Sequence, residues 1–558
     1  MNAIRRYLKK ATIPIIFVAL LSILVVNTGF VRQNFVITKN LDIFIDLFGK
    51  LFYNYVDEFD PNELMRTGIN AMLHSLDPYS EFIPDTNTDD IRFMTTGRFD
   101  GFGISVRQKD GYIIIYDVFE GFPADKAGLQ HGDRILEIDG KGAKNLTPDN
   151  AQLMLKGEAG TDITLVVARE GVENNLIVKM EREVVKISNI SYYGVIKDSK
   201  TGYLALEGFT EDAGMEVRNA VRYLKREHDI ENLIIDLRDN AGGLISEAVN
   251  VINLFVERNR EVLNTRGRIA ERNMTYKTLN QPLDLDIPLA ILVNGNSASA
   301  SEVVAGVIQD FDRGVIIGQR TFGKGSVQRI IPLTYGSAVK VTVSRYYIPS
   351  GRGVQNADHS PEEAKSGTEA TPDSLLATFT TINGRTVLGG GGIRPDITTQ
   401  PKTQSNIAFA LSNGFHIFEF ANHFFRNNPS ILPPHQFTIT DQLYSDFVKF
   451  LDGRNYSFDS DTELLVDYLR SIADKENYLD EISDQIDTIE QRVAKSKKND
   501  LFVHRDEISA LLRQEIVNRY YKQRGRKISS LMDDPEIAKA LEILRDRDMY
   551  NQLLMPKK

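Results

Sequence analysis

The chain contains no cysteine among its 558 residues, so disulfide bonds and thiol catalysis are excluded. This absence is compatible with an oxidising compartment but does not require one. The eight histidines show no spacing typical of metal ligands, and the sequence therefore predicts neither a metal site nor a bound cofactor. An excess of basic residues is missing too, because the formal net charge is −10, which argues against a nucleic-acid partner.

The residues that are present indicate several globular domains. Hydrophobic residues make up 42% of the chain and charged residues 25%, values typical of folded proteins. A chain of 558 residues is too long for one hydrophobic core, so we expect a multidomain α/β protein. The patterns predict a membrane anchor, a helical cap, a β-rich domain, an α/β core with a mostly parallel sheet and a helical C-terminal region, over residues 1–35, 36–96, 97–183, 184–400 and 401–558.

The N-terminal segment has the pattern of a membrane anchor. Four basic side chains, Arg5, Arg6, Lys9 and Lys10, precede an uncharged, mostly aliphatic stretch over residues 11–31. That length can span a bilayer, and the basic cluster places the N-terminus in the cytoplasm. We therefore expect an uncleaved signal anchor, a single pass through a bacterial inner membrane and the bulk of the chain in the periplasm. A cleaved signal peptide is the alternative, although no clear small-residue cleavage site is present.

A serine-rich junction follows one of the apolar runs. The run Leu289–Val293 predicts a buried strand, which Asn-Gly-Asn ends before a helical pattern that reaches about Asp310. Ser299 falls at the start of that helix, where backbone N–H groups have no helical partner and can hold an anion. Ser299 and Glu302 also match a capping box, which is a common structural feature. The serine alone therefore does not distinguish helix capping from catalysis.

Two further segments lie at the same edge of the predicted sheet. Lys324 stands between two glycines after a second apolar run over residues 315–318, and Gln328 follows in a segment with a strand pattern. The sequence Asp-Leu-Arg-Asp-Asn-Ala-Gly-Gly occupies residues 236–243, again at the end of an apolar run. An exposed lysine needs no flanking glycines, whereas glycines let backbone and side chains crowd into a site. The combination favours a functional site over a helix cap.

The three motifs together closely resemble those of the C-terminal processing peptidases, which are tail-specific serine proteases with a Ser/Lys dyad. The family patterns S-A-S-A-S-E, F-G-K-G-[ST]-V-Q and D-L-R-x-N-x-G-G all stand unbroken here, at residues 297–302, 322–328 and 236–243. The resemblance extends from about Leu41 to Ile397. Three linked motifs make it specific, and it implies a serine endopeptidase.

The resemblance implies that Ser299 is the nucleophile, that Lys324 is its base and that Gln328 orients the lysine. A serine hydroxyl is a weak nucleophile and needs a base. A free lysine has a pKa of about 10.4, and burial lowers this value so that the neutral amine can accept a proton. The tetrahedral oxyanion requires two donors. These donors are expected from the backbone N–H groups of Ala300 and of Gly242 or Gly243.

Residues 97–183 resemble a PDZ domain. The signature is a Pro-Ala…Ala-Gly-Leu…Gly-Asp pattern over residues 123–140, joined to the loop Gly101-Phe102-Gly103-Ile104. The resemblance implies that successive N–H groups of this loop bind a substrate's C-terminal carboxylate while the tail adds as a strand to the sheet edge. The expected partners are protein substrates with free, apolar C-terminal tails. The domain either only tethers the substrate or also obstructs the active site when it is empty.

From Tyr203 onward, strand and helix patterns alternate, which indicates α/β crossovers and a largely parallel sheet. The expected strands lie at residues 203–207, 232–238, 289–293 and 314–318, and the expected helices at residues 213–228, 244–256 and 299–310. Upstream, Leu76-Asp77-Pro78-Tyr79-Ser80 resembles the family's L-D-P-H-S, with tyrosine in place of histidine. We interpret this segment as a structural N-terminal cap, so the departure puts little of the chemistry in doubt.

A seven-residue repeat runs through the C-terminal region. Its members are Leu465, Ile472, Leu479, Ile486 and Val493, which form a partial coiled-coil seam. Packing against the chain's own core and formation of a homo-oligomer through these helices are both open.

The expected function is that of a membrane-anchored, periplasm-facing serine endopeptidase of the C-terminal processing type. Its PDZ domain would capture the C-terminal tails of protein substrates and deliver them to the Ser299–Lys324 dyad. The alternatives are a non-catalytic ligand- or peptide-binding protein on the same fold and a PDZ scaffold with an idle peptidase domain. The dyad together with Gln328 favours the enzyme, because a non-catalytic relative has no reason to keep all three residues.

Overall fold

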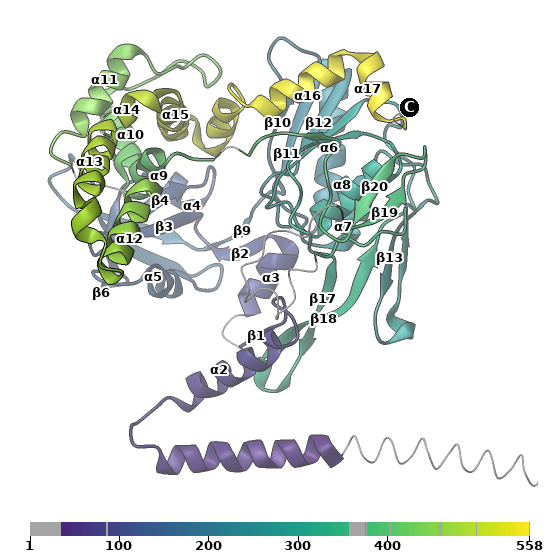
Figure 1. Ribbon diagram of the computed structural model, residues 1–558, viewed down its shortest axis with the longest axis horizontal. Coiled ribbons are helices and arrows are strands. Elements are labelled where there is room, and N and C mark those ends of the chain that lie inside the picture. The colour runs from purple at the N-terminus through teal and green to yellow at the C-terminus, as the bar shows by residue number, and fades with distance from the viewer. Residues whose placement is uncertain are drawn as a thin grey trace, which may run out of the picture. The chain divides into compact units, whose positions relative to one another are not determined.

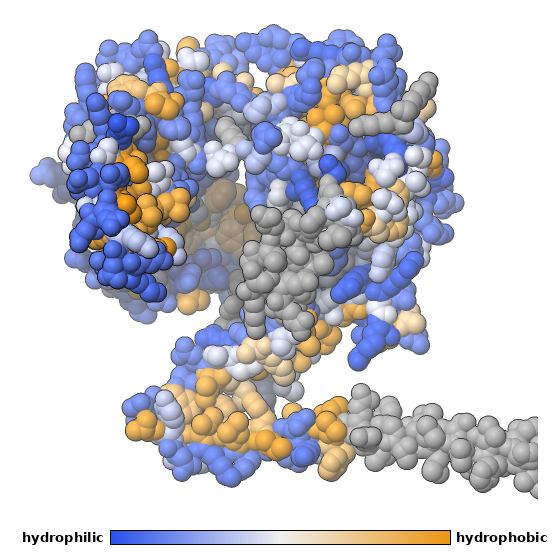
Figure 2. All heavy atoms as spheres, viewed as in Figure 1, coloured by the Kyte–Doolittle hydropathy of each residue, from blue (hydrophilic) through white to orange (hydrophobic). Residues whose placement is uncertain are grey.

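The first unit of the chain contains two helices among its described residues (Figure 1). The computed structural model describes residues 35–84, 88–356, 374, 376–401, 403–454, 456, 460–497 and 499–556. The contacts divide the chain into two units, Met1–Leu76 and Asp77–Lys558. The first unit has a helix over residues 35–54, which carries many exposed apolar side chains (Figure 2), and α2 (Pro61–His74). Asp60 starts α2, because its carboxylate accepts a hydrogen bond from the Asn62 N–H.

The predicted membrane anchor over residues 11–31 lies outside the described residues. Within the described ranges, no helix has both the length and the apolar character needed to cross a bilayer. The anchor, the single pass and the periplasmic location therefore stay predictions.

A β-rich module with its own apolar core follows the helix α3 (Thr88–Thr96). Strand β7 shows why it folds as it does, since every second side chain from Ile163 to Val167 is buried and the others face outward. Its sheet has the order β3-β4-β5-β7-β8 with β6 beside β5, while β2 pairs with β9. The elements are β2 (Arg98–Gly101), β3 (Ile104–Lys109), β4 (Tyr112–Val118), α4 (Pro123–Lys126), β5 (Arg134–Ile138), β6 (Lys141–Gly142), α5 (Pro148–Leu155), β7 (Asp162–Ala168), β8 (Leu176–Glu181) and β9 (Glu183–Lys186).

A six-stranded sheet with the order β10-β11-β12-β15-β16-β21 forms the centre of the next module. Its strands are β10 (Ile190–Val195), β11 (Thr201–Leu206), β12 (Asn232–Asp236), β15 (Leu289–Val293), β16 (Val315–Gly318) and β21 (Ile397–Thr398). All pairings in it are parallel except that of β10 with β11. Strands β12 and β15 are buried along their whole length, as continuous apolar runs in a sheet covered on both faces should be.

Helices cover both faces of this central sheet. Alternate residues of the strands pack against α6 (Ala213–His228), α7 (Ile245–Ile252) and α8 (Ala300–Asp310). The residues between them pack against α16 (Pro535–Arg545) and α17 (Arg547–Leu553), which come from the far end of the chain. The predicted C-terminal region 401–558 therefore supplies one layer of the α/β core.

The prediction of a mostly parallel core holds only for this sheet, because the sheets of the described chain are mostly antiparallel. A second core sheet has the order β1-β18-β13-β14, with β17 on β18, and a separate hairpin pairs β19 with β20. Its strands are far apart in sequence, so local alternation could not reveal the pairing. The strands are β1 (Glu81–Ile83), β13 (Glu261–Arg266), β14 (Thr275–Lys277), β17 (Ser326–Pro332), β18 (Ala338–Tyr347), β19 (Ala377–Thr380) and β20 (Thr386–Gly389), with short 3-10 turns at Ala270–Arg272 and Thr334–Gly336.

The remaining helices form a separate layer, and most of them contribute to an apolar core of that layer. They are α9 (Asn406–Asn413), α10 (His416–Asn427), α11 (Asp441–Phe450), α12 (Asp461–Lys475), α13 (Leu479–Lys497), α14 (Asp500–Val503) and α15 (Arg505–Ser530). In the α12–α13 hairpin, Ile486 is buried but Leu465 is 66% exposed, so the seven-residue repeat is not buried as one seam. Self-association through these helices stays a prediction.

This helical layer also contacts the β-rich module. Tyr116 of β4 stacks on Phe418 of α10, with ring centroids 5.1 Å apart. The buried Asp117 carboxylate next to it accepts hydrogen bonds from the side chains of Asn518 and Gln523 on α15.

Candidate active site

Ser299 occupies the junction between β15 and α8, at the carboxyl end of the parallel strands. Its backbone has φ 54° and ψ −112°, a conformation that a residue with a Cβ rarely adopts and that marks stored strain. The half-buried side chain stands at the start of α8, and the following Ala300 contributes the first N–H group of the helix. This sharp turn presents one hydroxyl at the rim of the sheet.

The two neighbouring serines of the motif are held inside the fold. Ser297 is fully buried and donates its hydroxyl to the carbonyl of Leu237 at 2.7 Å. Ser301 is equally buried and donates to the carbonyl of Asn240 at 2.8 Å. Both hydroxyls thus attach the serine motif to the glycine-rich turn, and of the three serines Ser299 is the one whose side chain is partly exposed.

The glycine-rich turn over residues 236–243 passes directly beside Ser299. A side chain at Gly242, where φ is 102°, would place its Cβ 2.9 Å from both Ser299 Cβ and the Ala300 nitrogen, so only glycine fits. The Gly242 N–H is already donated to Asn240 Oδ1 at 2.9 Å. Within the described part of the chain, the N–H groups of Gly243 and Ala300 have no acceptor. Gly243 and Ala300 are therefore the backbone donors that remain available at this turn.

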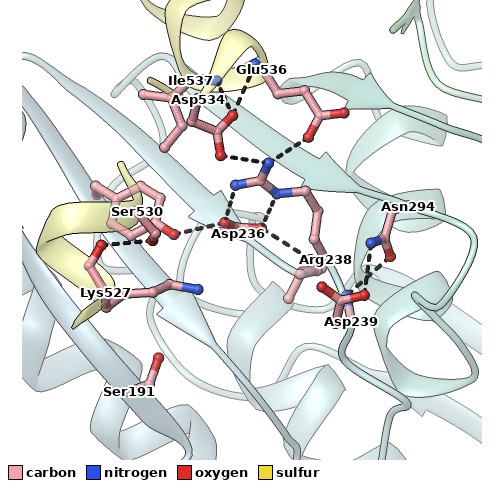
Figure 3. Close-up of polar contacts among 12 residues, drawn as sticks. Ser191, Asp236, Arg238, Asp239, Asn294, Lys527, Ser530, Asp534, Glu536 and Ile537 are labelled. Atoms are coloured by element: carbon pink, nitrogen blue, oxygen red, sulfur yellow. Dashed lines mark hydrogen bonds and ion pairs between the residues drawn. The ribbon is translucent and has the colours of Figure 1, made fainter. Parts of the chain in front are cut away.

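Behind this turn, Arg238 is held from two directions (Figure 3). Its guanidinium makes a two-pronged contact with Asp236 of β12, at 2.9 and 2.6 Å. Its Nη1 lies 2.8 Å from Asp534 Oδ2 and 2.5 Å from Glu536 Oε2, at the start of α16. The next residue, Asp239, accepts hydrogen bonds from the side chains of the Asn-Gly-Asn turn that precedes the serines. Helix α16 is thereby attached to the turn that contains the Gly243 N–H.

Lys324 lies in the loop between β16 and β17, and one buried carboxylate connects this loop to Ser299. Glu302 Oε2 accepts hydrogen bonds from the backbone N–H groups of Ser299 and Lys324, both at 2.8 Å. Its Oε1 accepts from the Gly323 N–H at 2.8 Å and from Thr321 Oγ1 at 2.6 Å. Burial raises the pKa of Glu302, and these four hydrogen bonds act against that rise.

A tyrosine from β18 makes a second connection. The buried Tyr346 hydroxyl lies 2.7 Å from the Lys324 carbonyl and 3.1 Å from the Ser299 carbonyl, so it donates to one of them at a time. Two side chains, Glu302 and Tyr346, therefore fix the backbones of both predicted dyad residues.

The surroundings of Lys324 favour a neutral amine. Its side chain is half-buried, and this burial lowers its pKa below the usual 10.5. The Lys340 ammonium lowers the pKa further, whereas the carboxylates of Glu302 and Asp77 raise it. Lys324 Nζ lies 4.8 Å from the ring centroid of Tyr79, within the range of a cation–π contact.

The position of Tyr79 adds to our interpretation of the segment over residues 76–80. We expected a structural cap, and the aromatic ring of this segment faces the predicted base. The departure from the family's histidine marked this residue in the sequence. No sequence pattern indicates that Lys324, far downstream, lies against it.

Gln328 lies on β17 near Lys324 in sequence, but its amide serves another contact. Its Nε2 donates to Ser326 Oγ at 2.8 Å and to Thr342 Oγ1 at 3.1 Å. The first hydrogen bond stays within β17, and the second attaches β17 to β18. The orientation of the lysine by Gln328 stays a prediction.

The loop Gly101–Ile104 borders a separate groove of about 310 Å³ in the β-rich module. The carbonyls of Phe102 and Gly103 accept hydrogen bonds from the N–H groups of Ala124 and Phe119, which fixes the loop. In the described part of the chain, the N–H groups of Phe102 and Gly103 themselves have no acceptor. Phe93, Phe99 and Leu155 supply apolar walls. Among the described residues, no cluster of acidic side chains and histidines is arranged to hold a metal ion.

Comparisons with known proteins place three family models on the chain. They are peptidase family S41 over residues 200–364, the PDZ domain over residues 90–168, and the C-terminal helical domain of a probable PDZ-protease over residues 407–544.

Among curated relatives, a carboxy-terminal-processing protease of Bartonella bacilliformis is 37% identical over 327 residues, covering 58% of this chain and 74% of the relative. A probable CtpA-like serine protease of Staphylococcus aureus is 31% identical, covering 58% of this chain and 64% of the relative. A solved structure of the photosystem II D1 C-terminal processing protease is 25% identical, covers 64% of this chain and 93% of that chain, and has a TM-score of 0.35.

Proposed function

The chain belongs to the carboxy-terminal-processing protease family, and from this premise we propose that it cleaves protein substrates with a Ser299–Lys324 dyad. The observation that carries the proposal is the shared anchoring of the two residues. They come from different motifs, and the Glu302 carboxylate accepts a hydrogen bond from the backbone N–H of each. The lowered pKa of Lys324 supports the role of a base.

In the first step, the neutral Lys324 amine accepts the Ser299 proton as Oγ attacks the carbonyl carbon of the scissile peptide bond. The tetrahedral oxyanion accepts hydrogen bonds from the backbone N–H groups of Ala300 and Gly243. The Lys324 ammonium then returns its proton to the leaving amine, and an acyl-enzyme remains. Water attacks this ester with the amine again acting as base, and release of the carboxylic acid restores Ser299.

Gly243 is favoured over Gly242 as the second oxyanion donor. The N–H of Gly242 is donated to Asn240 Oδ1, so its use would first require breaking a hydrogen bond within the turn. Gly242 contributes by its lack of a side chain, which lets the turn approach Ser299.

We propose that the PDZ domain captures the C-terminal tails of these substrates. The tail carboxylate accepts hydrogen bonds from the N–H groups of Phe102 and Gly103, in the loop Gly101–Ile104. The tail adds as a strand beside β3, and its last apolar side chain fills the groove between Phe99 and Leu155. The apolar segment over residues 11–31 anchors the enzyme in the membrane, with the protease in the periplasm.

The direct test is cleavage by the full chain in detergent, with an unstructured protein that ends in an apolar tail as substrate. We expect cleavage by the wild type and none by Ser299→Ala or Lys324→Ala, with circular dichroism showing all three folded. An amidated tail removes the carboxylate and should weaken cleavage by raising KM. Binding of the tail without cleavage by the wild type would instead identify a non-catalytic binding protein on this fold.

A further inference from the structure

Tyr79 is fixed in place by the turn that carries it. Asp77 Oδ1 accepts hydrogen bonds from the N–H groups of Tyr79 and Ser80, at 2.9 and 2.8 Å. The Ser80 hydroxyl in turn accepts a hydrogen bond from the Thr342 N–H on β18, at 3.3 Å, and the following strand β1 pairs with β18. The turn is therefore part of the same antiparallel sheet as β17, which begins two residues after Lys324.

The side chain of Gln355 connects the surroundings of Tyr79 to the lysine loop. Gln355 acts on the Tyr79 hydroxyl, whose pKa it lowers, and its Oε1 accepts the Gly325 N–H at 3.0 Å. Burial raises the pKa of Tyr79 to about 12, so the ring remains a neutral phenol at any ordinary working pH. The ring face, and not a phenolate, is what lies 4.8 Å from Lys324 Nζ.

Glu302 is the carboxylate with the largest effect on the pKa of Lys324, and both of its oxygens already accept hydrogen bonds from other groups. Glu302 accepts four hydrogen bonds, two at each oxygen, from Ser299, Thr321, Gly323 and Lys324 backbone or hydroxyl donors. A carboxylate paired directly with the ammonium would hold the lysine protonated and remove the base. An aromatic face attracts the ammonium more weakly and leaves it able to lose its proton.

We propose that Tyr79 is a positioning residue for the base: its ring holds the Lys324 side chain and stabilises the ammonium that forms in each half-reaction. Residue 79 then sets the pH range in which the enzyme works. This inference rests on the proposed dyad. The groups facing the amine are Tyr79, Glu302, Asp77 and Lys340, and the last three contribute charge that is the same in every variant compared below.

The test compares Tyr79→Leu, which removes the ring but keeps apolar bulk, with Tyr79→Phe, which keeps the ring and removes only the hydroxyl. The full chain is assayed in detergent for the pH dependence of kcat. Loss of the ring destabilises the ammonium, so the acidic limb of the Leu variant should move to lower pH by roughly half a unit to one and a half units. The Phe variant should keep the wild-type limb. Tyr79→Met replaces the Leu variant if that protein does not fold.

A second measurement does not depend on cleavage. In a Ser299→Ala background, Lys324 is labelled with trace acetic anhydride at a series of pH values, and the labelled peptide is quantified by mass spectrometry. Its reactivity midpoint should fall in the Leu or Met variant and stay unchanged in Phe. Equal midpoints in the Leu and Phe proteins, or a rise in Leu alone, would overturn the inference. Cleavage that survives Ser299→Ala would overturn the dyad instead, and the labelling would still decide the contact.

Discussion

The predicted nucleophile and the predicted base stand on two differently built regions. Ser299 begins α8, a helix in which every residue is buried, and its neighbours Ser297 and Ser301 are hydrogen-bonded inside the fold. Lys324 precedes the β17–β18 hairpin, whose strands are mostly half-exposed and whose tip residue Tyr335 is 96% exposed. Hydrogen bonds in the core fix the geometry of the serine, whereas burial and an aromatic face adjust the proton affinity of the lysine.

This contrast predicts all-or-none effects on the serine side and graded, pH-dependent effects on the lysine side. The largest effect is expected among the three serines. Ser299→Ala should reduce kcat by at least about 10³-fold without loss of stability. Ser297→Ala and Ser301→Ala should instead each cost about 1 kcal/mol in stability, because each removes one of the two hydrogen bonds that the buried carbonyls of Leu237 and Asn240 accept.

Hydrogen exchange of the α8 amides measures this stability for the peptidase module by itself. If Ser297→Ala were as inactive as Ser299→Ala while α8 kept its wild-type protection, Ser297 would become the candidate nucleophile and the contrast would fail.

Glu302 joins the two regions, so its substitution should affect both. In Glu302→Gln one oxygen becomes an amide N–H₂ group, and whichever oxygen is replaced, two of the four donors then face another donor. We expect a loss of about 2–4 kcal/mol in stability and a decrease of at least 10-fold in kcat. Thr321→Ser is the matched control, since it keeps the hydroxyl that donates to Glu302 and accepts the Ile393 N–H, and it should cost at most about 1 kcal/mol. Wild-type exchange rates at α8 in the Gln protein would show that the carboxylate is not needed.

The sequence was informative where the determining pattern is local. Apolar runs followed by glycine-rich or serine-rich turns predicted strands β12, β15 and β16 and the placement of three motifs at their ends. Pairings between distant strands could not be predicted, because nothing near Glu81 in the sequence indicates that β1 lies beside Lys340 of β18. For the same reason the packing of α16 and α17 on the central sheet could not be predicted, since an amphipathic pattern does not show which surface a helix packs against.

Within the site, residue types were predictable and orientations were not. The Glu302 capping-box pattern was visible, but its second pair of donors comes from the lysine loop. The choice between Gly242 and Gly243 depends on where the Asn240 amide points, and the contact of Tyr79 depends on the β1–β18 pairing. Each of these orientations is determined by the three-dimensional structure and not by the local sequence.

The smallest effect belongs to the lysine itself and has a definite sign with pH. Burial holds the folded-state pKa of Lys324 below its unfolded value of about 10.4. Between these two values the unfolded chain binds a proton that the folded chain does not, so this group makes the unfolding free energy rise with pH. Below both values the two states are protonated alike, and the folded state carries the full cost of the half-buried ammonium. Lys324→Met should therefore be more stable than the wild type at pH 7, by up to about 1 kcal/mol because solvent reaches the side chain.

That advantage should shrink as the pH rises toward about 10.4, above which the lysine is mostly neutral in both states. Exchange of the α8 amides at pH 7 and at pH 10 measures the difference, and Lys197→Met, in the exposed turn between β10 and β11 of the same module, is the control, for which the two pH values should give the same result. If Lys324→Met were no more stable than the wild type at pH 7, burial of the Lys324 ammonium would not reduce the unfolding free energy. Lys324 would then be an ordinary surface lysine, and the difference between a fixed nucleophile and an adjusted base would have no physical basis.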